Sequence, residues 1–107
     1  LDSFEEKFSD FIGTKYAIAT SSCTGAIYLS LLAGGISEGD EVIVPELTWV
    51  ATASAIKYTG AKPIFADIDI DTWCIDTGQL ENLVTRNTEM ILHIIKHGAE
   101  NTMNKYN

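Results

Sequence analysis

The sequence predicts an α/β protein with a mostly parallel sheet, and three observations lead to this prediction. Short β-branched and apolar runs of strand length alternate along the chain with stretches that have helical spacing. Glycine or proline stands near the ends of most of these runs, as expected for turns between strands and helices. The composition, 46% hydrophobic and 21% charged, is ordinary for a globular protein. Strands that alternate with helices in this way pair in parallel, because the helix provides the crossover.

The first third of the chain predicts a helix, a strand and a second helix. Residues 1–12 place apolar side chains at helical spacing, and Gly13 ends the pattern. Residues 16–20 are a short apolar run that fits a buried strand. Residues 24–32 have the composition of a helix, and the Gly34-Gly35 pair follows its end.

The middle of the chain repeats this alternation. Residues 41–45 (EVIVP) predict a second strand after the turn-forming residues 37–40. Residues 48–58 fit a helix closed by Gly60, and residues 62–67 predict a third strand. Because parallel strands end at the same edge of a sheet, the turns that follow them should lie on one edge, where open α/β sheets bind ligands.

The last third predicts a loop over residues 69–76, a helix over 77–84 and a fourth strand over 90–95. The remaining residues, 96–107, are polar and close no element. We therefore expect residues 1–107 to form a single incomplete domain, part of a larger one.

Charge and composition exclude several function classes. Fifteen acidic residues against seven basic ones give a formal net charge of −8, which disfavours binding to nucleic acid or to an anionic membrane surface. No apolar stretch approaches the roughly 20 residues of a membrane span, and no signal peptide is evident. Cys23 and Cys74 form no disulfide framework, which suits a reducing cytoplasm. His93 and His97 lack a third ligand nearby, so we expect no metal site.

Residues 20–26 (TSSCTGA) lie where a predicted strand gives way to a predicted helix. Unpaired N–H groups and the positive end of the helix dipole meet there, and small residues let an anion approach the backbone. The segment could therefore bind a phosphate. Taken alone, however, the same composition more often marks a helix cap at Ser22 or Thr24, with Gly25 and Ala26 allowing close packing.

A second turn makes the ligand-binding interpretation stronger. After the strand at 41–45, Thr48 and Trp49 open the next predicted helix, which should start at the same sheet edge as residues 20–26. An aromatic ring beside an anion-binding helix start suits a phosphorylated planar ligand. The alternative is that Trp49 is a core or interface residue, since most tryptophans are largely buried.

These motifs, in this order, resemble the DegT/DnrJ/EryC1/StrS family of pyridoxal-phosphate-dependent sugar aminotransferases of fold type I. The resemblance rests on LDSFEEKF, GTKYAIATSSCTGA, GDEVIVP, TWVAT and GAKPIFADID, and it extends from Leu1 to about Ile94 without an evident gap. It implies that this chain is the N-terminal part of the large domain that binds pyridoxal 5'-phosphate (PLP).

The resemblance also implies site residues. The PLP phosphate would be held by a Ser-x-Thr-x-Ala segment in which Cys23 replaces a common glycine, and the ring would stack on Trp49. The implied phosphate-binding residues are Ser22, Cys23, Thr24, Gly25 and Ala26. Thr48 and Thr52 either line the site or only start the helix. Asp67 and Asp69 match the family pattern, and we interpret them as strand-end and loop residues before ligand contacts.

For the whole protein, the resemblance implies transfer of an amino group from an amino-acid donor, glutamate, to a nucleotide-linked keto-sugar by a cytoplasmic homodimer. None of the six lysines occupies the family's Schiff-base context, so we expect the chain alone to be inactive. Near the end, Ile95 stands where the family has a histidine. The sequence does not identify the sugar or the ring carbon that is aminated. It also leaves open two alternative functions: a dehydratase of the same family, and a stand-alone module that binds a phosphorylated small molecule without catalysis.

Overall fold

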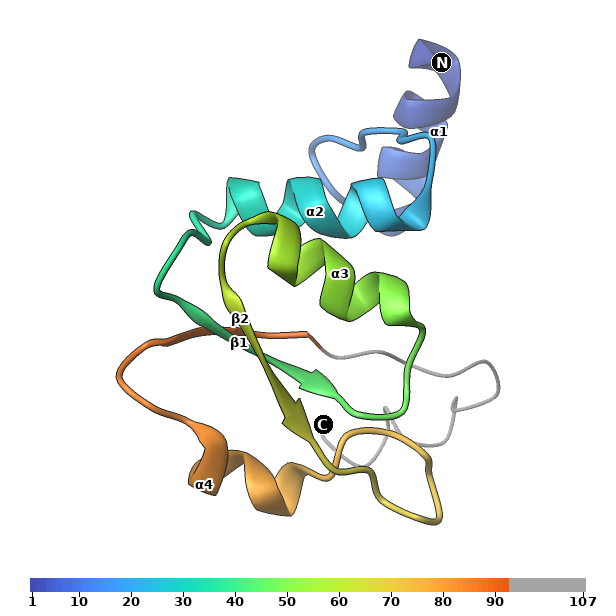
Figure 1. Cartoon of the computed structure of the whole chain (residues 1–107). Helices are drawn as coiled ribbons and strands as arrows, with labels where there is room; N and C mark the ends of the chain where they lie inside the picture. The colour runs from blue at the N-terminus through green and yellow to red at the C-terminus, as the bar shows by residue number, and fades with distance from the viewer. Residues whose placement is uncertain (93–107) are drawn as a thin grey trace.

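A computed structural model describes residues 1–92 and confirms the α/β class (Figure 1). Its elements, in chain order, are α1 (Asp2–Ile12), α2 (Cys23–Ala33), β1 (Glu41–Pro45), α3 (Val50–Tyr58), β2 (Lys62–Ala66), the 3₁₀ helix η1 (Thr77–Gln79), α4 (Leu80–Leu83) and β3 (Thr88–Ile91).

The sheet within this part of the chain is parallel, with the strand order β2-β1-β3. The central strand β1 pairs with β2 on one side and β3 on the other, so that Ile43 lies between Ile64 and Ile91. Both faces of β1 are covered, and Val42, Ile43 and Val44 are fully buried. This explains why its sequence is a continuous apolar run rather than an alternating one.

The two faces of the sheet carry separate apolar clusters. Val42 and Val44 pack with residues of α2 and α3, including Leu31 and Ile56. Ile43 points to the opposite face, where it packs with residues near η1 and α4. Figure 1 shows this arrangement, with α2 and α3 on one side of the strands and α4 on the other.

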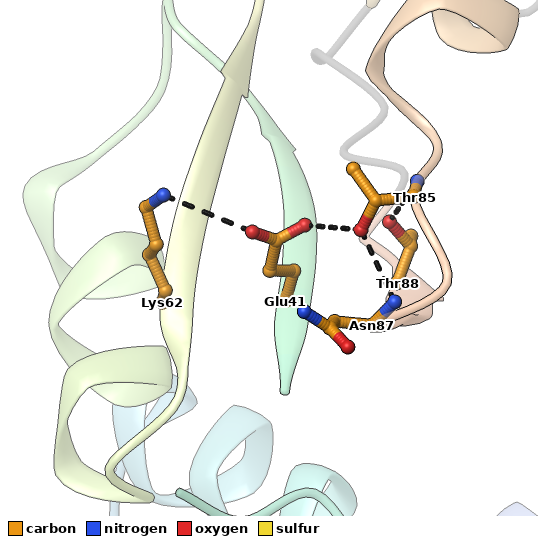
Figure 2. Close-up of polar contacts among 5 residues, drawn as sticks. All are labelled: Glu41, Lys62, Thr85, Asn87 and Thr88. Atoms are coloured by element: carbon orange, nitrogen blue, oxygen red, sulfur yellow. Dashed lines mark hydrogen bonds and ion pairs between the residues drawn. The ribbon is translucent and has the colours of Figure 1, made fainter. Parts of the chain in front are cut away.

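Polar contacts join the three strands at their amino ends (Figure 2). The Glu41 carboxylate lies 3.7 Å from Lys62 Nζ of β2 and accepts a 2.7 Å hydrogen bond from the Thr85 hydroxyl ahead of β3. The Glu41 N–H donates to the Asn87 carbonyl at 2.7 Å. Thr85 Oγ1 also accepts from the Asn87 N–H, and Thr88 Oγ1 accepts from the Thr85 N–H.

The strand predicted over residues 16–20 is wrong. This segment has no regular secondary structure and joins no strand among residues 1–92, and Ile18 is 80% exposed. The Ala19 N–H instead donates to Glu5 Oε1 of α1 at 2.6 Å. An apolar run forms a strand only when a neighbouring strand supplies hydrogen bonds, and the described sheet supplies none here.

Other predicted boundaries need smaller corrections. Helix α3 begins at Val50 rather than Thr48, and the helix predicted over 77–84 is a 3₁₀ turn followed by one turn of α-helix. The last described strand begins at Thr88 rather than at residue 90 and ends at Ile91, and residues 93–95 of the predicted strand lie outside the described residues. His93, His97 and Ile95 lie outside the described residues.

Candidate functional site

Ser22 caps α2 at the turn formed by residues 20–26. Its backbone is extended, and its hydroxyl oxygen accepts a hydrogen bond from the Gly25 N–H at 3.1 Å. The Ser22 carbonyl accepts from the Ala26 N–H and from the Thr20 hydroxyl, at 3.0 and 2.9 Å. The predicted helix cap is therefore present, at Ser22 rather than Thr24.

The cap leaves two N–H groups of the first turn unoccupied. Within residues 1–92, the amides of Cys23 and Thr24 donate to no other group, and the Thr24 hydroxyl likewise has no hydrogen bond. Cys23 is exposed and Thr24 is half-buried, so these donors lie at the surface. Capping and anion binding can thus coexist in this turn, because they use different N–H groups.

Gly25 gives the turn its close geometry. A Cβ atom at this position would lie 3.3 Å from Ser22 Oγ, tighter than most real contacts of a Cβ atom. A larger side chain would push the capping hydroxyl away and fill the space beside the free amides. The absence of a side chain at residue 25 therefore supports both the cap and access to the backbone.

Trp49 occupies the equivalent position at the start of α3. It is the residue before the helix, and its carbonyl accepts a hydrogen bond from the Thr52 N–H at 3.0 Å. Its side chain is 85% exposed, so Trp49 is not a core residue of the described structure. A ligand or protein partner that covered this indole would gain hydrophobic free energy.

The two helix starts lie on one side of the molecule. Helices α2 and α3 pack against each other, and Figure 1 shows both beginning on the side toward which β1 points. The turn at Ser22 and the turn at Trp49 are consequently presented from the same edge of the sheet. This is the edge at which open parallel sheets bind ligands.

The other sequence-predicted residues lie nearby or have structural contacts. Thr48 Oγ1 and Thr52 Oγ1 are 3.4 Å apart, and Thr52 is buried. Asp67 and Asp69 follow β2 and are exposed, and their carboxylates accept hydrogen bonds from backbone N–H groups of the next few residues. The contacts of Asp69 therefore stabilise the loop that follows β2.

The lysines within residues 1–92 have ordinary surface environments. Lys57 lies in the last turn of α3, at the opposite end of that helix from Trp49. Lys62 pairs with Glu41 at the amino ends of the strands, and Lys15 lies over the Tyr16 ring at 5.1 Å. Lys7 is exposed on α1.

Three general features bear on the class of site. In the described residues, no group of three or more His, Cys, Asp or Glu side chains is arranged to hold a metal ion. None of the helices found in residues 1–92 has the length and apolar character needed to cross a bilayer. Cys23 and Cys74 are both free thiols.

Comparison with known proteins then places the chain. Its sequence matches the DegT/DnrJ/EryC1/StrS aminotransferase family over residues 1–107. The chain belongs to this family. Among curated relatives, it is 47% identical over 98 residues to a GDP-perosamine synthase from Escherichia coli O157:H7, which covers 92% of this chain and 27% of that enzyme.

Solved structures of the family have the same fold. NtdA from Bacillus subtilis with bound cofactor PMP superposes with a TM-score of 0.87 at 38% identity, covering 98% of this chain and 26% of NtdA. A GDP-4-keto-6-deoxymannose-3-dehydratase, solved with PLP and glutamate trapped together, gives 0.78 at 35% identity over 86% of this chain and 25% of the dehydratase. The chain thus spans about a quarter of the length of these relatives.

Two contacts at the site escaped the sequence analysis. The Glu5 carboxylate holds the segment that leads into the 20–26 turn, and Thr52 contacts Thr48 from a buried position. The i, i+4 spacing of Thr48 and Thr52 was a visible signal for the second contact. Nothing in the sequence pairs Glu5 with Ala19, fourteen residues away.

Proposed function

We propose that this chain forms the cofactor-phosphate-binding part of a PLP-dependent aminotransferase that moves an amino group from glutamate to a nucleotide-linked keto-sugar. One observation carries the proposal: the free amides at the start of α2 and the exposed Trp49 at the start of α3 occupy the same side of the sheet. Membership of the family agrees with it.

The residues present fit a phosphorylated planar cofactor. The Cys23 and Thr24 amides and the Thr24 hydroxyl would hold the phosphate, assisted by the positive end of the α2 dipole. Trp49 would cover one face of the ring. When bound, PLP supplies an electron sink that allows an amino group to pass between an amine and a carbonyl compound.

Residues 1–92 therefore bind and orient, and other groups complete the chemistry. A lysine to hold the cofactor and move protons, and a carboxylate for the pyridine nitrogen, are needed in such an enzyme. Lys15 and Lys62 belong to other contacts, Lys57 lies at the far end of α3 from Trp49, and Lys7 is exposed on α1. We place the catalytic lysine outside residues 1–92 of the protein, and we propose no catalytic residue within them.

The relatives support the choice of substrates. The GDP-perosamine synthase and the GDP-sugar dehydratase are both named for GDP-linked sugars, and the dehydratase was solved with glutamate. These names favour a nucleotide-linked acceptor and glutamate as donor. They also keep a dehydratase as the second candidate, since the relative of that activity is 35% identical.

The phosphate site can be tested in the full-length protein that carries this chain, titrated with PLP and with pyridoxal, which lacks the phosphate. Thr24→Ala should weaken PLP binding about 10-fold or more, because hydrogen bonds to a charged group are worth about 1.5–3 kcal/mol, and should leave pyridoxal binding unchanged. Ser30→Ala is the control, since the Ser30 hydroxyl bonds within α2 to the Ala26 carbonyl. Equal loss for both ligands, or no loss for either, would contradict the proposal.

Activity separates the candidate functions. Incubation of the full-length protein with PLP, glutamate and a GDP-linked 4-keto sugar should yield an amino sugar and 2-oxoglutarate in equal amounts. Loss of a sugar hydroxyl without amination would indicate the dehydratase. If the 107-residue chain binds PLP and the full-length protein shows no turnover, a stand-alone binding module would be favoured.

We also propose a cytoplasmic homodimer. Two free cysteines, one of them exposed, suit a reducing compartment. Several large apolar side chains of α1, among them Phe8 and Phe11, are substantially exposed, which favours a protein contact over that helix. Sedimentation of the full-length protein should give twice the mass of one chain.

A further inference from the structure

Thr52 is an unusual polar residue in this structure, because its hydroxyl is buried and bonds outside its own helix. Only 2% of the residue is exposed, and its Oγ1 lies 3.4 Å from Thr48 Oγ1, in the turn that precedes α3. The hydroxyl of Ser9, another buried polar residue, instead donates to the Glu6 carbonyl within α1. The Thr52 contact therefore links the packed body of α3 to the turn.

The turn between β1 and α3 is held at both ends. At its start, the Glu46 N–H donates to the Ala66 carbonyl of β2 at 2.8 Å. At its end, Thr52 makes two contacts: its hydroxyl meets that of Thr48, and its N–H donates to the Trp49 carbonyl at 3.0 Å. The backbone that carries Trp49 is thus fixed, although the indole itself is exposed.

This combination is informative because a hydrogen-bonded backbone and an exposed aromatic side chain occur at the same residue. An indole that must meet a flat ring binds it well only if its position is set beforehand, since ordering it during binding costs free energy. A buried threonine hydroxyl needs a hydrogen-bond partner, and the Thr48 hydroxyl is the partner that the structure gives Thr52. This contact favours one position of Thr48.

We propose that Thr52 is a positioning residue for the cofactor site: through Thr48 it fixes the turn that presents Trp49 to the ring of the ligand. The inference rests on the proposed function, because it takes Trp49 as the ring contact. It adds a residue that never touches the ligand and yet sets its affinity.

The test is a double-mutant cycle in the full-length protein, in a background where Phe replaces every tryptophan except Trp49, Trp73 included, so that Trp49 provides the fluorescence. Thr52→Val keeps the shape and removes the hydroxyl, whereas Thr52→Ser keeps the hydroxyl. We expect Thr52→Val to weaken PLP binding about 3- to 10-fold, as for loss of one hydrogen bond, and to lower the fluorescence anisotropy of Trp49. Thr52→Ser should restore both.

The cycle is closed with Trp49→Ala. If Thr52 acts through the indole, Thr52→Val should change PLP affinity by less than about 2-fold once Trp49 is gone. An undiminished effect in the Trp49→Ala background would overturn the inference, as would unchanged affinity in Thr52→Val when Trp49→Ala alone weakens binding. If Trp49→Ala leaves PLP affinity unchanged while Thr24→Ala reduces it, Trp49 is not the ring contact. The role proposed for Thr52 would then be wrong, whereas the proposed phosphate site would still be supported.

Discussion

Ser22 shows how a helix cap can leave neighbouring backbone donors free. A helix leaves its first N–H groups without partners, and each needs a side chain, water or a ligand. The Ser22 hydroxyl satisfies the Gly25 N–H, and the amides of Cys23 and Thr24 remain available. The stability of α2 is thereby supplied without using the donors that a phosphate requires.

Replacing this cap should cost stability. Ser22→Ala removes the acceptor for the Gly25 N–H, and loss of a serine cap typically costs about 1 kcal/mol of the free energy of unfolding. Urea unfolding of the 107-residue chain measures this change. Ser21→Ala is the matched control, because the Ser21 side chain makes no hydrogen bond within the described residues, and it should stay within about 0.5 kcal/mol of the parent sequence. Equal losses in the two variants would contradict the capping role.

At the scale of elements, local sequence predicted the buried central strand, although its partner β3 lies far along the chain. Residues 42–45 (VIVP) are apolar because β1 is covered on both faces, and α3 and β2 follow it with short turns. Residues 16–20 have equally strand-like composition, but no described strand pairs with them. Whether a partner strand exists is information that a five-residue run does not contain.

Some features of the candidate site could likewise be predicted from local sequence, and others could not. Ser22 and Trp49 could be predicted as helix-start residues, because capping composition and turn chemistry are local. The contact between Glu5 and Ala19 depends on how α1 folds back along the following segment, and the burial of Thr52 depends on the sheet beneath it. Such contacts depend on tertiary packing.

Glu5 should anchor the segment that leads into the 20–26 turn. Its carboxylate accepts the Ala19 N–H at 2.6 Å, and α1 otherwise makes no extensive contact with another element of the described structure. In Glu5→Gln the bond to an ionised acceptor becomes a neutral one, which should cost about 1 kcal/mol and speed hydrogen exchange at the Ala19 amide. Glu6→Gln, an exposed neighbour, is the control. Unchanged protection of Ala19 in Glu5→Gln would exclude the anchor.

The polar cluster at the amino ends of the strands (Figure 2) allows a direct comparison of two contacts to one carboxylate. Thr85→Val removes the 2.7 Å bond to Glu41 and the acceptor for the Asn87 N–H, so it should lower the free energy of unfolding by about 1 kcal/mol. Lys62→Ala should change it by less than about 0.5 kcal/mol, since the Lys62 side chain is 71% exposed and its ion pair is screened by water. Urea unfolding decides between them, and a larger loss for Lys62→Ala would reverse this ranking.

Considered as a whole, the molecule places the polar contacts that join its strands at a different edge from its candidate site. The Glu41 cluster holds the amino ends of the three strands, whereas the starts of α2 and α3 lie on the side toward which β1 points. Thr85→Val should therefore lower the free energy of unfolding without changing PLP affinity. Thr24→Ala should weaken PLP binding without changing the free energy of unfolding. Separate edges for the two tasks follow from a parallel sheet, whose strands all begin on one side and end on the other.

The exposed apolar surface of α1 predicts self-association of the 107-residue chain. Phe4 and Phe8 stack with their ring centroids 5.8 Å apart, yet they remain 59% and 46% exposed, and Phe11 is 84% exposed. Because α1 stands beside the rest of the structure without extensive contacts, this surface stays available to a second copy (Figure 1). Replacement of Phe4 and Phe11 by serine should shift the chain toward monomer in sedimentation velocity, with little loss of stability, since these two side chains are already 59% and 84% exposed. Phe65→Ser, on the edge strand β2, tests the competing surface: if it alone abolishes association, the copies meet through the sheet edge and not through α1.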